Sequence, residues 1–129
     1  MAMSFMQMAE EAMAEVDGID AEAAHRQLQE NSEALLIDVR DAADLPSTGV
    51  PVGGVNISLG MLPVRADQEL PEDWRDVRLQ DRSRRIITTC PLGPNGARGA
   101  KVLKDMGFTN VAYMEGGMAA WTEADLPAD

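Results

Sequence analysis

The segment RIITTCPLGPNGARGAKVLKDMG, residues 85–107, decides the fold. Residues 85–89 have the β-branched composition of a strand, residues 90–96 are rich in proline and glycine, and residues 97–106 have the pattern of a helix that Gly107 ends. A strand that leads through a short turn into a helix is the repeating unit of a parallel sheet. The segment therefore predicts an α/β fold.

The sequence on both sides of this segment continues the alternation. Further strands are predicted at 35–39, 55–57 and 111–113, and further helices at 21–30 and 118–124. Residues 58–81 are predicted to be mostly loop with one short helix. A chain of 129 residues with this pattern predicts a single α/β domain in which a central parallel β-sheet is flanked by helices.

Residues 1–16 precede this pattern and are rich in methionine and alanine. Their apolar residues recur at roughly helical spacing, at Phe5, Met6, Ala9, Met13 and Val16. We expect an N-terminal accessory helix or tail over 1–16 and a domain over 17–129. The helix either packs on the domain or docks a partner, because methionine suits adaptable surfaces.

The charge balance restricts the partners of the chain. Acidic residues outnumber basic ones by 22 to 11, which gives a net charge of −11 at pH 7. The resulting field repels nucleic acids and anionic membranes, so we expect neither as a partner. A single cysteine cannot form an intramolecular disulfide, and Glu10, Glu11 and Glu15 interrupt any signal-peptide pattern. We therefore expect a cytoplasmic protein.

Cys90 lies where the predicted strand ends. Ligands bind at the carboxyl ends of strands in open α/β sheets, beside helix N-termini whose free N–H groups stabilise a thiolate or an anion bound on its sulfur. A lone cysteine after a strand is otherwise a small buried hydrophobic residue. Gly93 and Gly96 favour the first interpretation, because they permit a tight cradle of N–H groups.

His25 is the single histidine, and no second histidine, cysteine or patterned carboxylate accompanies it. Metal sites need several such ligands, so we predict no metal and no other cofactor. We do not expect His25 to act as a base for Cys90 either, because the loop amides make a base dispensable.

Several motifs carry a family resemblance: LLIDVRDAADL (35–45), GGVNISL (53–59), ITTCPLGPNGA (87–97) and LKDMGFTNVAYMEGGMAAW (103–121). Together they resemble successive motifs of rhodanese-like domains, in the family's order, over residues 19–127. The segment GMLPVRAD (60–67) resembles a bacterial single-domain subset. The resemblance implies a cysteine that accepts a sulfane sulfur as a persulfide and passes it to a thiol or to cyanide. Cys90 matches that cysteine.

The loop after Cys90 departs from the family's pattern. Asn95 stands where family members usually carry arginine, and Gly96 stands where serine is common. Pro91 and Pro94 have no N–H to offer. The expected substrate-binding donors are therefore the N–H groups of Leu92, Gly93, Asn95, Gly96 and Ala97.

Two arginines are candidates to replace the missing loop cation. Arg98 lies about one helical turn beyond Asn95 and reaches back only if the start of the helix allows it. Arg65, within GMLPVRAD, is the stronger candidate for a cation near the pocket; the alternative is a surface arginine paired with Asp67 or Asp41.

Asp38 and Arg40 belong to the Asp-Val-Arg part of the first motif. We expect them to form a buried or half-buried ion pair that ties the first motif's strand to neighbouring loops near the site, with a structural rather than a catalytic role. Asp38 is also placed to accept N–H groups of a loop.

The resemblance implies a sulfurtransferase that uses a small sulfur donor of the thiosulfate or persulfide type and a thiol acceptor, with a protein as another acceptor. A non-catalytic rhodanese-like binding module is the alternative, supported by Asn95 and the two loop prolines. Phosphatase or arsenate reductase chemistry is the third hypothesis. It requires an arginine spaced to clamp a tetrahedral oxyanion, which the loop lacks.

Overall fold

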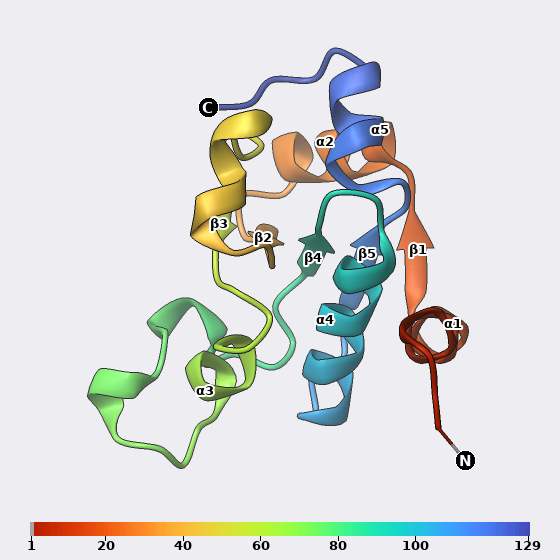
Figure 1. The fold of residues 1–129 in the computed structure, drawn as a ribbon. Helices are drawn as coiled ribbons and strands as arrows, with labels where there is room; N and C mark the ends of the chain where they lie inside the picture. The colour runs from red at the N-terminus through yellow and green to blue at the C-terminus, as the bar shows by residue number, and fades with distance from the viewer. Residues whose placement is uncertain (1) are drawn as a thin grey trace.

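Five parallel strands form the centre of the computed structural model, which describes residues 2–129 (Figure 1). Their order across the sheet is β1-β5-β4-β2-β3. The strands are β1 (Asp17–Ile19), β2 (Leu35–Asp38), β3 (Val55–Asn56), β4 (Ile86–Thr89) and β5 (Val111–Met114). The helices are α1 (Phe5–Glu15), α2 (Ala21–Glu30), α3 (Leu62–Ala66), α4 (Pro94–Asp105) and α5 (Gly117–Glu123). The predicted parallel α/β sheet with flanking helices is confirmed.

The sheet separates two hydrophobic clusters, because successive strand residues point to opposite faces. Leu35, Ile37 and Ile86 face a cluster that includes residues of α1, α3 and α4. Leu36 and Ile87 face the cluster formed with α2 and α5. Every residue of β2, β4 and β5 is buried, as expected for parallel strands that are covered on both faces.

The edge strand β1 is the element that the sequence did not predict. It has three residues and pairs with β5, with Asp17 opposite Ala112. The segment Asp-Gly-Ile has no strand pattern of its own, so its conformation depends on the neighbouring β5. The strand places the N-terminal part of the chain beside the last strand of the sheet.

The predicted N-terminal helix is present as α1, and it packs on the domain. Ser4 and Gln7 form a capping box at its start. Its buried face carries Ala9 and Ala12, small side chains that let α1 approach α4 closely. At its end, the Nζ atom of Lys104 donates to the Glu15 carbonyl at 2.5 Å.

The segment between β3 and β4 contains the short helix that was predicted there, α3, and two 3-10 turns at Glu72–Trp74 and Val77–Leu79. A third 3-10 helix, Ala42–Ser47, follows β2. None of the helices in the described part of the chain is long and apolar enough to span a membrane.

Candidate active site

Cys90 follows the last residue of β4, at the carboxyl edge of the sheet. Its side chain is 1% exposed and belongs to the cluster on the α4 face of the sheet. The backbone N–H of Gly93 donates to the Sγ atom at 3.0 Å. The loop therefore folds over the sulfur and offers it a hydrogen bond, which is stronger when the sulfur carries negative charge.

Helix α4 begins at Pro94, three residues before the start at residue 97 that the sequence pattern predicts. Gly93 is the N-cap with φ 120°, a conformation that side-chain-bearing residues rarely adopt. Proline suits the first helical position, where no N–H is needed. Asn95 and Gly96 are consequently residues of the first helical turn rather than of the loop.

The early helix start changes which N–H groups are free. The Ala97 N–H donates to the Gly93 carbonyl at 3.0 Å, so the prediction that Ala97 binds substrate through this group does not fit the structure. The N–H groups of Leu92, Asn95 and Gly96 have no acceptor within residues 2–129. They remain donors for a ligand at the start of α4.

Gly96 also lets α4 approach β4. A Cβ atom on residue 96 would lie 3.3 Å from the Cα of Thr89. The Oγ1 atom of Thr88 donates to the Gly96 carbonyl at 2.6 Å, in a buried hydrogen bond. The first turn of α4 is therefore fixed to the strand that carries Cys90.

The opposite side of the loop is held by α5. The Met118 N–H donates to the Cys90 carbonyl at 2.8 Å, and the Ala119 N–H donates to the Pro91 carbonyl at 3.0 Å. The sequence predicts a strand at 111–113 and a helix at 118–124, but not this contact between the start of the helix and the Cys90 loop. The signal was the glycine pair Gly116 and Gly117, because a close backbone approach requires residues without a side chain.

A hollow of about 660 Å³ lies on the α5 side of the loop. Its lining consists of Arg40, Ala43, Asp44, Ser47, Thr48, Pro91, Leu92, Met118 and Ala119. Cys90 is not part of this lining, because its side chain packs on the α4 face. The Leu92 side chain is 69% exposed at the edge of the hollow.

Asp38 and Arg40 form the buried ion pair that the sequence predicts. An Nη atom of Arg40 lies 2.6 Å from a carboxylate oxygen of Asp38, and the Nε atom of Arg40 donates to the other oxygen at 2.9 Å. The guanidinium also donates to the Thr48 hydroxyl at 2.8 Å and to the Gly49 carbonyl at 2.9 Å. The pair thus ties β2 to the loop at residues 42–49. Asp38 accepts the Arg40 N–H, at 3.0 Å.

Arg65 does not lie beside Cys90, which corrects the prediction of a compensating cation. Its guanidinium donates to the Trp74 carbonyl at 2.8 Å, and not to Asp67 or Asp41. It lines a separate hollow with Asp76 that includes no residue of the Cys90 loop. In Figure 1, α3 lies well below the loop that follows β4. The position of Arg65 depends on how residues 58–81 pack against the domain, which no local sequence pattern predicts.

Arg98 does reach back to the start of α4. One of its Nη atoms donates to the Oδ1 atom of Asn95 at 3.0 Å. Its guanidinium carbon lies 5.7 Å from the centroid of the Phe5 ring, within cation–π distance. Arg98 therefore connects the first turn of α4 with α1.

His25 contacts Trp121 edge to face, with ring centroids 5.5 Å apart. Within residues 2–129, no group of three or more His, Cys, Asp or Glu side chains is arranged to hold a metal ion.

Several known proteins are similar to this chain over most of its length. A family model described as the rhodanese-like domain matches residues 20–124. A sulfurtransferase from Allochromatium vinosum is 25% identical over 112 residues, which cover 87% of this chain and 94% of the relative.

Two solved structures are similar along almost the whole chain. One is a protein of unknown function from Rhodopseudomonas palustris, described as a possible tyrosine phosphatase: its TM-score is 0.91 at 25% identity, and the match covers 100% of this chain and 96% of that one. The other is a homodimeric polysulfide-sulfur transferase from Wolinella succinogenes, with a TM-score of 0.75, 30% identity, and coverage of 97% and 86%.

Proposed function

Since this chain belongs to the rhodanese-like domain family, we propose that it is a sulfurtransferase that carries a sulfane sulfur on Cys90. The hydrogen bond from the Gly93 N–H to the Sγ atom, 3.0 Å long, is the observation that carries the proposal. This donor stabilises negative charge on the sulfur in the thiolate and in the persulfide. The sulfurtransferases from A. vinosum and W. succinogenes support the assignment.

The reaction consists of two transfers at sulfur. The Cys90 thiolate attacks the outer sulfur of a thiosulfate-like donor, the S–S bond of the donor breaks, and sulfite leaves with the bonding electron pair. Cys90 then carries a persulfide anion. An acceptor thiolate attacks the terminal sulfur of this persulfide and leaves as a new persulfide, and the Cys90 thiolate is restored.

The free N–H groups at the start of α4 bind the negatively charged species of both steps, first the donor anion and then the persulfide anion on Cys90. Leu92, Asn95 and Gly96 contribute these groups, and they take over part of the role of the arginine that Asn95 replaces. Because the sulfur is 1% exposed, a small donor reaches it more easily than a folded protein does. A small thiol is the proposed acceptor, a protein thiol is the alternative acceptor, and a reducing cytoplasm is the proposed location.

Two competing functions make different predictions. A binding module would not need the Cys90 sulfur. The exposed Leu92, beside the hollow on the α5 side of the loop, would then contact the bound partner. A phosphatase, as suggested for the R. palustris protein, requires an arginine that clamps a tetrahedral oxyanion. In this chain Asn95 occupies the position of that arginine, and Arg98 is bonded to Asn95.

Intact-protein mass spectrometry under non-reducing conditions tests the proposal. The wild-type protein and Cys90→Ser are incubated with thiosulfate and, separately, with a small persulfide. A gain of one sulfur, about 32 mass units, in the wild type alone supports the sulfurtransferase. No gain from either donor contradicts it and favours the binding module, whereas hydrolysis of p-nitrophenyl phosphate by the wild type but not by Cys90→Ser favours the phosphatase.

A further inference from the structure

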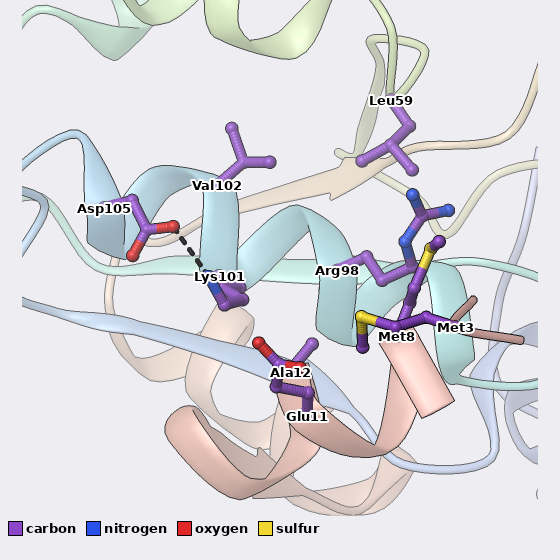
Figure 2. Close-up of a pocket in the computed structure, with 9 residues that line it drawn as sticks. All are labelled: Met3, Met8, Glu11, Ala12, Leu59, Arg98, Lys101, Val102 and Asp105. Atoms are coloured by element: carbon purple, nitrogen blue, oxygen red, sulfur yellow. Dashed lines mark hydrogen bonds and ion pairs between the residues drawn. The ribbon is translucent and has the colours of Figure 1, made fainter. Parts of the chain in front are cut away.

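The contact between α1 and α4 includes a chain of three side chains that ends at the sulfur site. Phe5 stacks on the guanidinium of Arg98, and Arg98 donates to Asn95 in the first turn of α4. Figure 2 shows the guanidinium of Arg98 between Leu59 and the side chains of Met3 and Met8. These residues line a hollow of about 380 Å³ between the two helices.

The bond to Arg98 fixes which way the Asn95 amide faces. A guanidinium has only donors, so the atom of Asn95 that it contacts must be the carbonyl oxygen. Arg98 lies one turn further along α4, so the oxygen faces the C-terminal direction of the helix. The NH₂ group on the other side of the planar amide then faces the N-terminal end of α4. No side chain or carbonyl within residues 2–129 accepts a hydrogen bond from it.

The N-terminal end of α4 is where the sulfur lies. Gly93, the N-cap of α4, donates to the Sγ atom of Cys90 at 3.0 Å. An NH₂ group on this side of the Asn95 amide would face the region that a persulfide or donor anion on Cys90 enters. If the amide were free to rotate, the oxygen would face this region half of the time and would repel the anion.

We propose that Arg98, which Phe5 holds in place, is a positioning residue that orients the Asn95 amide with its NH₂ group toward the anion on Cys90. This inference rests on the proposed sulfur chemistry and deepens it. Arg98 does not touch the sulfur or the substrate in this role. The N-terminal helix α1 thereby becomes part of the active site, although it lies outside the matched residues 20–124.

A double-mutant cycle tests the proposal. Arg98→Met is expected to lower kcat/KM for thiosulfate about twofold, because a freely rotating amide presents its NH₂ group to the anion only about half of the time. Arg98→Lys keeps a donor and is expected to lose less. In the Asn95→Ala background, Arg98→Met is expected to change nothing further, because Arg98 acts only through Asn95.

A merely structural role of Arg98 gives a different result. Its loss would then reduce kcat/KM by the same factor in the wild-type background and in the Asn95→Ala background, and this additive outcome would overturn the proposal. An unchanged kcat/KM in Arg98→Met would overturn it as well. Lys101→Met is the matched control. Lys101 lies on the same helix, lines the same hollow and also contacts α1, through Glu15, but it bonds to Asp105 rather than to Asn95. We expect no change in kcat/KM for this control.

Alkylation of Cys90 by iodoacetamide separates this inference from the proposed function. If the wild type accepts no sulfur in the mass-spectrometric experiment, the sulfurtransferase fails, but the alkylation rate still reports the donors around the thiolate. The alkylation rate then replaces kcat/KM as the quantity measured in the same double-mutant cycle. A change in Arg98→Met that disappears in the Asn95→Ala background supports the positioning role, and an additive change or none overturns it.

Discussion

Gly117 lies so close to the carbonyl oxygen of Cys90 that a Cβ atom on residue 117 would clash with this oxygen. The φ angle of Gly117 is 57°, in the left-handed region. The next residue, Met118, donates its N–H to the same carbonyl at 2.8 Å. The start of α5 is thus in direct backbone contact with the cysteine, on the other side from α4.

Gly117→Ala is expected to lower the free energy of unfolding by about 3 kcal/mol or more, because it adds a backbone clash to the cost of a left-handed conformation. Gly53→Ala is the matched control. Gly53 has φ 84° and nothing within 4 Å of an added Cβ, so it carries only the conformational cost, about 1 kcal/mol. Urea denaturation measures both losses. Equal losses would show that the approach of Gly117 to Cys90 is not as tight as the structure has it.

Thr88→Val is expected to lower the free energy of unfolding by about 1 to 2 kcal/mol, because it removes the buried 2.6 Å hydrogen bond to the Gly96 carbonyl. Thr89→Val is the matched control, since the Thr89 hydroxyl contacts the Cys90 carbonyl only at 3.4 Å. We expect a smaller loss there, measured by the same urea titrations. A larger loss for Thr89→Val would contradict the assigned role of Thr88.

Arg40→Met is expected to lower the free energy of unfolding by about 3 to 5 kcal/mol, because it leaves the Asp38 carboxylate buried without its partner. Adding Asp38→Asn to this variant removes the unpaired charge. The double variant should therefore unfold at a higher urea concentration than Arg40→Met alone. A double variant that is less stable than Arg40→Met would show that the unpaired charge is not the main cost.

Asp76→Asn is expected to reduce stability at pH 7 by about 1 kcal/mol or less, as is typical of an ion pair with an exposed partner. The side-chain hydrogen bond from Arg78 holds the pKa of Asp76 below its ordinary value of 3.8. Because the pKa of Asp76 is lower in the folded protein than in the unfolded chain, the ionised carboxylate stabilises the fold. This stabilisation is complete at pH values above the unfolded-state pKa, and it is lost as the pH falls through the folded-state pKa.

The stability difference between Asp76→Asn and the wild type should therefore shrink below pH 3.8 and vanish in stronger acid. Thermal unfolding followed by circular dichroism between pH 2 and pH 7 measures it. Asp73→Asn, which removes a carboxylate that makes no side-chain hydrogen bond or ion pair within residues 2–129, is the control and should show no such dependence. A constant difference for Asp76→Asn would exclude the charged pair as its cause.

Much of the fold was predictable because its central strands have the composition of buried strands. Residues 35–39 are mostly apolar and residues 86–89 are all β-branched, so both segments were predicted as strands, and the position of Cys90 at the end of the second followed directly. The start of α4 was not predicted, because Pro94 and Gly96 were assigned to a loop. Proline is in fact well suited to the first position of a helix, so Pro94 was itself the missed signal.

The side-chain partners in the site were less predictable. With α4 starting at Pro94, Asn95 and Arg98 become an i, i+3 pair on one helix, and their contact could have been inferred. Arg65 is different, because its place depends on how a long segment with little regular structure packs. The strand β1 likewise has no local pattern and depends on β5.

The position of α1 and β1 also bears on the order in which the protein folds. The contact between Lys104 and Glu15 spans 89 positions of the sequence, and β1 pairs with a strand near the other end of the chain. Contacts over such separations form slowly, because a long stretch of chain must first be ordered. We expect α1 to dock after the central strands have assembled. Phe5 would then reach Arg98 in one of the last steps of folding, so the sulfur site would be completed only when α1 has packed against α4.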